Sequence, residues 1–574
     1  MPDESPANPK SQSESQPRPN ALAGREWLIV WAVVFAAFSP CLTARFVNWD
    51  DPAFLLENPV IHSLAPRNLI SIFTSFHADY YAPLVFLSYA LEHAAWGFNP
   101  AGYHAVNVAL HCLAACLALR LLKTLGVSHG LALWLSVIWA VHPMKVESVA
   151  WVTERKDVLC GVFAVAAMVL YIQYLRCGNR SRYAASLAAS VAAMMCKGMA
   201  LTIPLILFVL DAIEGVRQER RRLAEKAPFF IAAALFGATT FIAQRGGEVT
   251  SASQILDLRR NVLVAAFSLW FHLGKFVFPD RLSAIYPLPE PVSLHNTIYA
   301  ASLASTFIAA IVLLRLSRRF PNAALGAAWF YAAFLPVSQW IPLRIPLADR
   351  YLYLPSLAMV WTAGAAANRL AGRPKAMRLA RNLAAAVALC LAMLAFSRCM
   401  VWRDSSTLWN DVLAKFPGRW EAHLNLGHYY ANRPNPDPIA AAAHYEAALR
   451  GNPASENAAY NLGNLKMRAG HYDEAAALFE KVIEIRPARR DAALNLAFCR
   501  VQQRRFDEAL AIYDRLILEN PRWAAPLASR GAVLFYCGRL DEARRDCLRA
   551  LEIDPRCPEA QETLQRIEAA SRNQ

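Results

Sequence analysis

The chain has 574 residues, of which 56% are hydrophobic and only 18% are charged. One ordinary soluble domain is shorter and carries more charge, so length and composition together exclude that class. The formal net charge of +15 would suit a nucleic-acid-binding protein. However, the basic residues lie in short groups between apolar segments and not on one polar face, which is typical of cytoplasmic loops under the positive-inside rule.

The N-terminal segment, residues 1–24, is rich in Pro, Ser, Asn and Gln, and we expect a disordered tail. The apolar run from Trp27 to Thr43 follows without an Ala-x-Ala cleavage site, so it is interpreted as a first membrane helix and not as a signal peptide. The 12 cysteines include no Cys-x-x-Cys pair and no zinc-like spacing with histidine, which predicts small core residues.

Apolar segments that approach the roughly 20 residues of a spanning helix recur throughout residues 25–400. Residues 183–212 could form one long helix or a tight hairpin around Lys197-Gly198. Several candidates are short, as tilted or half-inserted helices are. The twelve candidates lie near residues 27–43, 104–122, 130–146, 157–175, 183–196, 199–212, 227–244, 261–279, 297–316, 323–341, 350–368 and 380–400.

The Lys and Arg residues between these segments predict the orientation. The basic residues before the first apolar run place the N-terminus inside, and residues 44–103 and 147–156 outside. Counting back from the basic residues 369–381 places the C-terminal region outside. The two counts disagree by one crossing within residues 213–295, so we expect 11 or 12 crossings, with one interfacial or re-entrant segment in that range.

Residues 401–574 are charged like a soluble helical protein and repeat with the tetratricopeptide period. Small residues let paired helices cross closely, and a proline ends each pair. The pattern predicts about four repeats plus a half-repeat at residues 402–417, with a generic helical bundle as the alternative. Small residues recur at spacings of 36, 34 and 34 as Gly427, Gly463, Ala497 and Gly531, and prolines follow at Pro487, Pro521 and Pro555.

The first external loop opens on two adjacent carboxylates, Asp50 and Asp51, within the sequence Asn-Trp-Asp-Asp-Pro. Repulsion between them should raise one pKa, which suits a general base, although the same sequence is common in solvated turns. The loop also carries His77, Tyr80 and Tyr81. These rings could stack against a sugar or form an interfacial aromatic belt.

A third polar cluster lies in the second external loop and comprises His142 and the stretch 147–157, whose charged residues are Glu147, Glu154, Arg155, Lys156 and Asp157. Charged and polar groups are packed there between two apolar helices. They could form part of a binding site, or they could be the solvated residues of a plain loop.

Two further cations lie beside predicted membrane helices. A lysine at membrane depth is costly, so Lys197 is a functional candidate unless it snorkels to the surface, and a lipid-linked phosphate would be a natural partner for it. Arg350 opens a late membrane helix, where its guanidinium could fork onto a phosphate. Alternatively, Asp349 and Arg350 could form a pair at the helix start with no ligand.

Taken in chain order, these stretches resemble one family. The order is Asn-Trp-Asp-Asp-Pro at 48–52, Tyr-Tyr-x-Pro-Leu at 80–84, Tyr-His-x-x-Asn-Val-x-Leu-His at 103–111, His-Pro-x-x-Val-Glu-Ser-Val-Ala-Trp-Val-Thr-Glu-Arg-Lys-Asp at 142–157, Lys197, Leu-Ser-x-x-Tyr-Pro at 282–287, Asp-Arg-Tyr-Leu-Tyr-Leu-Pro at 349–355, and the repeats. The chain resembles the transmembrane and tetratricopeptide-repeat-containing O-mannosyltransferases, in a bacterial version.

This resemblance implies an all-α protein: a polytopic membrane bundle of the GT-C type at residues 25–400, followed by a repeat solenoid at 401–574. In such enzymes an acidic pair in the first external loop is the catalytic element, here Asp50 and Asp51, and one of them would deprotonate the acceptor hydroxyl. The candidates for holding the donor phosphate or supporting the base are Glu154, Arg155, Lys156, Lys197 and Arg350. The candidates for sugar or acceptor contacts are His77, Tyr80, Tyr81 and His142.

We therefore expect an enzyme that moves a hexose, by resemblance mannose, from a polyprenyl phosphate to Ser or Thr of a protein held by the repeats. It would lie in a bacterial inner membrane, with the N-terminus cytoplasmic and the repeats periplasmic. The sequence shows no evident cofactor or metal site and leaves metal dependence open.

Two alternatives belong to other classes of protein. The first is a membrane-anchored scaffold for envelope assembly, for which one or two membrane helices would suffice. The second is a transporter of lipid-linked sugars, whose polar groups should line a path through the middle of the membrane. About a dozen apolar segments, with polar clusters in the external loops, favour the enzyme.

Overall fold

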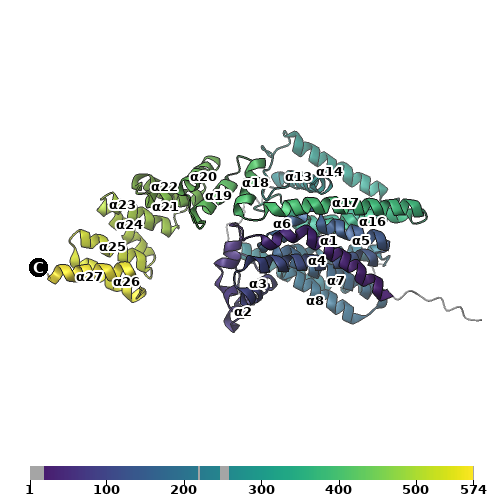
Figure 1. Cartoon of the computed structure of the whole chain (residues 1–574), viewed down its shortest axis with the longest axis horizontal. Helices are drawn as coiled ribbons and strands as arrows, with labels where there is room; N and C mark the ends of the chain where they lie inside the picture. The colour runs from purple at the N-terminus through teal and green to yellow at the C-terminus, as the bar shows by residue number, and fades with distance from the viewer. Residues whose placement is uncertain (1–18, 217–219, 246–256, 573–574) are drawn as a thin grey trace, which may run out of the picture. The chain divides into compact units, whose positions relative to one another are not determined.

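The computed structural model describes residues 19–216, 220–245 and 257–572 (Figure 1). Within these ranges the chain is helical, and its only β-type pairing is an isolated bridge between His77 and Tyr80. The chain divides into two compact units, one ending at Asp404 and one beginning at Ser405. The predicted tail lies outside the described residues as far as residue 18.

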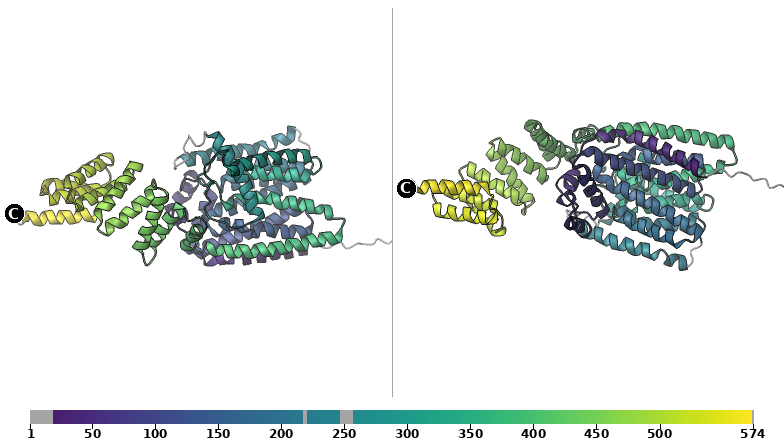
Figure 2. Two further views of the ribbon diagram at one scale, coloured as in Figure 1. Left: turned by 90° about the horizontal axis from the view of Figure 1, so that it is seen from above. Right: turned by 60° about the horizontal axis from the view of Figure 1, so that its bottom comes forward.

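The first unit is a bundle of long helices joined by short 3₁₀ turns, and Figure 2 shows the long helices running side by side. Its α-helices are α1 (Pro19–Phe38), α2 (Pro66–Thr74), α3 (Pro83–Trp96), α4 (Pro100–Thr124), α5 (His129–Val141), α6 (Val146–Ala150), α7 (Arg155–Cys177), α8 (Arg180–Met194), α9 (Ile203–Ile213), α10 (Arg220–Ala224), α11 (Ala227–Arg245), α13 (Leu258–Val277), α14 (Thr297–Leu316), α15 (Pro321–Phe334), α16 (Ser356–Ala367) and α17 (Pro374–Val401).

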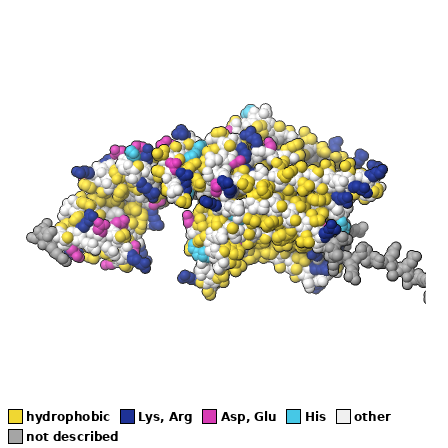
Figure 3. All heavy atoms as spheres, in the orientation of Figure 1, with side chains coloured by type: hydrophobic (Ala, Val, Ile, Leu, Met, Phe, Trp, Pro, Cys, Tyr) yellow, Lys and Arg dark blue, Asp and Glu magenta, His cyan; other side chains and the backbone are white. Residues whose placement is uncertain are grey.

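Each of the twelve predicted membrane segments overlaps one of these helices. Among the described residues, six helical stretches are long and apolar enough to cross a bilayer: Gly24–Thr43, Pro100–Thr124, Val152–Cys177, Arg222–Ala243, Thr297–Leu316 and Pro374–Val401. The face of this unit that Figure 3 shows is largely hydrophobic. Side chains such as Phe307 and Leu314 on α14 are 68% and 76% exposed, as residues facing lipid are. The first unit is therefore an integral membrane domain.

Residues 183–212 form a hairpin. Helix α8 ends at Met194, and the chain turns at Lys197 into the short helix η6 (Gly198–Thr202) and then α9. Glu214, just after α9, pairs with Arg176 near the end of α7, with 2.7 Å between Nε and Oε2. Both ends of the segment therefore return to the same side of the bundle, which places Lys197 at the opposite end.

Helices α13 and α14 run in the same direction. Leu263 near the start of α13 packs on Tyr299 near the start of α14, and Trp270 Nε1 donates to Thr306 Oγ1 further along, at 3.0 Å. Consecutive helices that each cross a bilayer completely must be antiparallel. Residues 278–296 therefore carry the chain back between α13 and α14, as a re-entrant segment within residues 213–295 would. The number of crossings, 11 or 12, stays a prediction.

The second unit is a series of helix pairs. Its helices are α18 (Ser405–Lys415), α19 (Trp420–Asn432), α20 (Pro438–Gly451), α21 (Glu456–Arg468), α22 (Tyr472–Ile485), α23 (Arg490–Gln502), α24 (Phe506–Glu519), α25 (Ala524–Tyr536), α26 (Leu540–Ile553) and α27 (Pro558–Arg572). A Cβ atom on Gly427 would lie 2.6 Å from the ring of Tyr445, and one on Gly531 would lie 2.7 Å from the sulfur of Cys547. The recurring small residues are thus required where the two helices of a pair cross.

Candidate active site

The carboxylate of Asp51 fixes the first external loop. It is 1% exposed, and its Oδ2 accepts a hydrogen bond from the Val47 N–H at 2.8 Å. Its Oδ1 accepts from the Thr153 N–H at 3.2 Å and also from the Thr153 hydroxyl. Burial raises the pKa of Asp51 to about 6, and repulsion from Asp50 contributes least. The sequence argument expected repulsion to dominate, whereas most of the effect comes from desolvation.

Stacked rings hold the same loop in place. The ring of Trp49 stacks on Trp151 with centroids 4.4 Å apart, and Trp402 stacks on Trp151 at 5.8 Å. Trp151 and Trp402 are almost fully buried. The loop that carries the two aspartates is therefore fixed against the segment that leads into α7.

Asp50 is placed differently from its neighbour. Its side chain is partly exposed, and no described residue forms a hydrogen bond or ion pair with its carboxylate. Burial raises the pKa of Asp50, and the nearby carboxylate of Glu154 adds to this effect, while the cations Lys156, Arg350 and Arg344 act in the opposite direction. Asp50 is thus an unengaged carboxylate that faces a group of positive charges.

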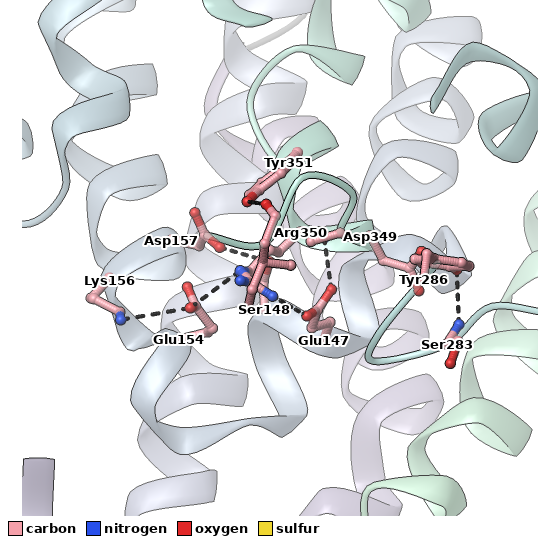
Figure 4. Close-up of polar contacts among 12 residues, drawn as sticks. Glu147, Ser148, Glu154, Lys156, Asp157, Ser283, Tyr286, Asp349, Arg350 and Tyr351 are labelled. Carbon is pink, nitrogen blue, oxygen red and sulfur yellow. Dashed lines mark hydrogen bonds and ion pairs between the residues drawn. The ribbon is translucent and has the colours of Figure 1, made fainter. Parts of the chain in front are cut away.

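Two of those cations, Lys156 and Arg350, belong to a buried ion-pair cluster centred on Glu154 (Figure 4). The carboxylate of Glu154 lies 2.8 Å from Lys197 Nζ, 3.4 Å from Arg350 Nε and 3.6 Å from Lys156 Nζ. Lys197 Nζ also lies 2.9 Å from Asp157 Oδ1. The hairpin of α8 and α9 and the start of α7 therefore bring together residues separated by 40 positions in the sequence.

Aromatic rings cover Lys156. Its Nζ lies 4.6 Å from the ring centroid of Phe54 and 4.5 Å from that of Tyr80. Tyr80 is paired through its backbone with His77, and the two residues between them have positive φ angles, which closes a tight turn. This turn presents Tyr80, 40% exposed, at the site. An exposed aromatic face beside a cation can stack against a sugar.

Arg350 is held by the short helix η8 (Asp349–Leu352) and by Glu147. The Arg350 N–H donates to Glu147 Oε2 at 3.0 Å, and the guanidinium pairs with Glu147 Oε1. On the other side of η8, the hydroxyl of Tyr286 donates to Asp349 Oδ1 at 2.6 Å (Figure 4). Burial, reinforced by Glu147, raises the pKa of Asp349 to about 7. Glu147 and Tyr286 were not selected as site residues from the sequence.

Lys145 is a further residue that the sequence analysis missed. It is 1% exposed, and its Nζ donates to the carbonyls of Leu352 and Tyr353 at 2.7 and 2.8 Å and to Ser356 Oγ at 2.6 Å. These contacts fix the turn that follows Arg350. The argument applied to Lys197, that a lysine in an apolar segment is costly, would also have identified Lys145.

Two predicted residues of the second external loop lie outside this cluster. Arg155 is fully buried and points toward α3 and α4, where it pairs with Glu92 and donates to Asn107 Oδ1 at 2.6 Å. His142 uses both ring nitrogens inside the protein. Its Nδ1 accepts from the Met144 N–H at 3.3 Å, and its Nε2 lies 2.9 Å from the carbonyl oxygen of Phe276. Neither side chain is available to a ligand.

Two predicted residues of the first loop also have structural partners. The Tyr81 hydroxyl donates to the Phe73 carbonyl at 3.0 Å, and His77 Nε2 lies 3.1 Å from the Ser71 carbonyl oxygen. In the described part of the chain, no group of three His, Cys, Asp or Glu side chains is arranged to hold a metal ion.

Comparison with known proteins gives two results for this chain. Residues 437–489 and 466–530 match models of the tetratricopeptide repeat, which confirms the predicted repeat type. The chain is also similar to proteins named protein O-mannosyl-transferase. One from Caenorhabditis elegans is 24% identical over 73% of this chain and 61% of its own length. One from Mus musculus is 26% identical over 71% and 64%, and one from Drosophila melanogaster is 30% identical over 33% and 23%.

The similarity to the first and second of these relatives extends over most of this chain but over a smaller share of the relatives' own length. This chain spans between about one quarter and two thirds of the length of the three curated relatives. The predicted resemblance to the transmembrane and tetratricopeptide-repeat-containing family is confirmed by these relatives and by the repeats.

Proposed function

Since the chain is a relative of the protein O-mannosyl-transferases, we propose that it is a membrane glycosyltransferase. It would transfer a hexose, by kinship mannose, from a polyprenyl phosphate to a Ser or Thr hydroxyl of a protein. The observation that carries this proposal is the unengaged carboxylate of Asp50 facing the buried cluster of Lys156, Lys197 and Arg350. A bacterial chain would carry out the reaction at the periplasmic face of the inner membrane, with its N-terminus in the cytoplasm.

Asp50 is the candidate general base. Its carboxylate accepts the proton of the acceptor hydroxyl while the hydroxyl oxygen forms a bond to C1 of the sugar. The bond between C1 and the phosphate oxygen breaks, its electron pair stays on that oxygen, and the configuration at C1 inverts. Asp51 cannot serve in the same way, because its two oxygens already accept three hydrogen bonds that fix the loop.

The cluster around Glu154 supplies fixed positive charge close to the leaving phosphate. Cations that are already oriented stabilise developing negative charge without reorganising during the reaction. The ion pairs keep Lys197 and Arg350 in place before the donor arrives. Tyr80 offers a ring for the sugar, and the repeats offer a protein-binding surface for the acceptor.

The test is transfer of radiolabelled mannose from polyprenyl-phosphate mannose to membrane protein. Loss of a general base costs roughly 10²- to 10⁴-fold in rate, so Asp50→Asn should reduce transfer by that factor. The matched control is Asp79→Asn, in the same loop. Asp79 is exposed and has a φ of +61°, a conformation that asparagine adopts readily, so transfer should be unchanged.

Asp51→Asn separates the two carboxylates. An amide oxygen can replace only one of the two acceptor atoms, so this variant should loosen the first external loop, detected as faster backbone hydrogen exchange over residues 46–52. If Asp50→Asn transfers mannose like the native chain, Asp50 is not the base. If the native chain transfers neither mannose nor glucose, galactose or N-acetylglucosamine, the proposed enzyme is wrong and a scaffold function takes its place.

A further inference from the structure

An ordered loop joins the two sides of the cation cluster. Residues 338–348, here called the strap, connect the short helix η7 (Leu335–Val337) to η8. Helix η7 packs against η6, which begins directly after Lys197, and η8 carries Arg350. Since both of its ends are anchored beside a site cation, the strap has to pass next to the site.

Internal hydrogen bonds fix the conformation of the strap. Gln339 is 2% exposed and has a φ of +68°. Its Oε1 accepts from the Leu343 N–H at 3.1 Å, and its Nε2 donates to the Val337 carbonyl at 3.2 Å. Further along, the Tyr351 hydroxyl donates to the Ile345 carbonyl. Buried hydrogen bonds hold Gln339 in this strained, positive-φ conformation, which indicates that the strap has one defined conformation.

The strap nevertheless exposes two large apolar side chains next to a cation. Trp340 is 44% exposed, although its Nε1 donates to the Tyr331 hydroxyl at 2.7 Å, and Ile341 is 69% exposed. Arg344, three residues further on, is also exposed and forms no ion pair or hydrogen bond with any described residue. Its charge acts on Asp50. The strap therefore carries an exposed apolar tip and an unpaired guanidinium within five consecutive residues, 340–344.

The charges inside the site call for an additional cation. The three cations of the cluster, Lys156, Lys197 and Arg350, are matched by three carboxylates, those of Glu147, Glu154 and Asp157. Asp50 and Asp51 add two further acidic groups. A phosphate anion that enters this site meets three oriented cations, but their charge is offset by at least as many carboxylates. Arg344 adds one positive charge that is not paired with a carboxylate of any described residue.

We propose that the strap binds the lipid-phosphate donor, with Arg344 on the phosphate and Trp340 and Ile341 on the first isoprene units of the chain. A polyprenyl phosphate combines an anion with a hydrocarbon tail, which matches a guanidinium beside an apolar tip. An anchor in the bilayer would explain the apolar tip alone and not the unpaired cation beside it in the sequence, whose charge acts on Asp50. The nature of the ligand rests on the proposed function, but binding of the carrier phosphate requires no transfer.

The experiment uses the full chain in detergent micelles and two probes without sugar: a long-chain polyprenyl phosphate and a phosphate with one isoprene unit. Direct binding is measured for both, and the KM values for donor and acceptor are measured with mannosylated donors of the same two chain lengths. Arg344→Gln should weaken binding of both probes about tenfold and raise donor KM with both lengths. The double variant Trp340→Ser with Ile341→Ser should weaken the long-chain probe and donor more than the short-chain ones, because the short probe offers only one isoprene unit to the tip. Acceptor KM should not change in either variant.

Matched controls come from the first external loop. Arg67→Gln removes another exposed arginine, and Ile70→Ser removes an isoleucine that is 63% exposed. Both should bind the two probes like the native chain, which excludes a general effect of surface charge or apolarity.

The outcomes distinguish this inference from the proposed function. If the native chain transfers mannose and Arg344→Gln leaves binding and donor KM unchanged, the strap assignment is wrong although the enzyme stands. If the serine variant weakens long and short probes equally, or neither of them, the apolar tip does not bind the isoprene chain and the assignment is again wrong. If the native chain binds polyprenyl phosphate through Arg344 but transfers no sugar, the strap is supported and the proposed function fails.

Discussion

Replacement of Glu154 by Gln tests the charge balance on which the candidate site depends. Glu154 is 3% exposed and faces three cations. The loss of stability in Glu154→Gln should nevertheless resemble that caused by breaking one buried ion pair. Lys197 keeps Asp157 at 2.9 Å, and Arg350 keeps Glu147. Lys156 loses its only ion-pair partner among the described residues. Breaking one buried pair typically costs about 3–5 kcal/mol.

The assay is hydrogen–deuterium exchange over peptides that cover residues 146–160, because a local measurement is not obscured by unfolding of the second unit. At 1.36 kcal/mol per tenfold change, a cost of about 3–5 kcal/mol corresponds to exchange roughly a hundred- to several-thousand-fold faster in Glu154→Gln. Peptides from the repeats should exchange as in the native chain, which provides an internal control.

The decisive variant adds Lys156→Met to Glu154→Gln. Methionine resembles the aliphatic stem of lysine and can remain between Phe54 and Tyr80. The double variant removes the uncompensated cation, so its exchange should be slower than that of Glu154→Gln alone, with a coupling between about 0.5 and 3 kcal/mol. Strictly additive effects of the two replacements would refute the ion-pair assignment and, with it, the charge balance that calls for Arg344.

Two further predictions concern the pH dependence and the topology. A general base must be ionised to accept a proton, and burial raises the pKa of Asp50. The acidic limb of the pH profile of kcat/KM should therefore lie above the ordinary carboxylate value near 4, and it should disappear in Asp50→Asn. A limb at or below pH 4 would contradict this prediction. Because α13 and α14 run in parallel, Leu258→Cys and Leu294→Cys, in a chain freed of its 12 native cysteines, should be labelled from the same side of the membrane by an impermeant thiol reagent. Labelling from opposite sides would show that α13 crosses completely.

The parts of the fold that depend on local periodicity could be predicted from the sequence. The small residues at Gly427, Gly463 and Gly531 mark real helix crossings, and every apolar segment overlaps a helix. Hydropathy could not decide between a helix and a hairpin at residues 183–212, because a run of about 30 apolar residues allows both. The decision depends on long-range contacts such as that of Glu214 with Arg176.

The sequence predicted which segments form the candidate site, but it did not predict the role of each residue in them. The sequence grouped Asp50 with Asp51, yet three hydrogen bonds engage only Asp51. The sequence also could not predict that His142 is buried with two hydrogen-bond partners inside the protein. The motif His-Pro is the same whether the ring nitrogens face a ligand or the protein. Arg344 could not be selected from the sequence, because the role of an exposed arginine in a loop depends on which charges lie near it in the fold.

The segment Thr153–Asp157 shows why such roles cannot be read from one sequence. Successive residues of a helix point about 100° apart, so Arg155 reaches Glu92 while Lys156 and Asp157 reach the site. In an amphipathic helix, the solvated face would tell which charges are free. Here every residue from Trp151 to Val158 is buried, so no solvated face exists. The role of each charged residue then depends on its ion-pair partner. Those partners are contributed by α3, by the turn before η6 and by the short helix η8, which carries Arg350.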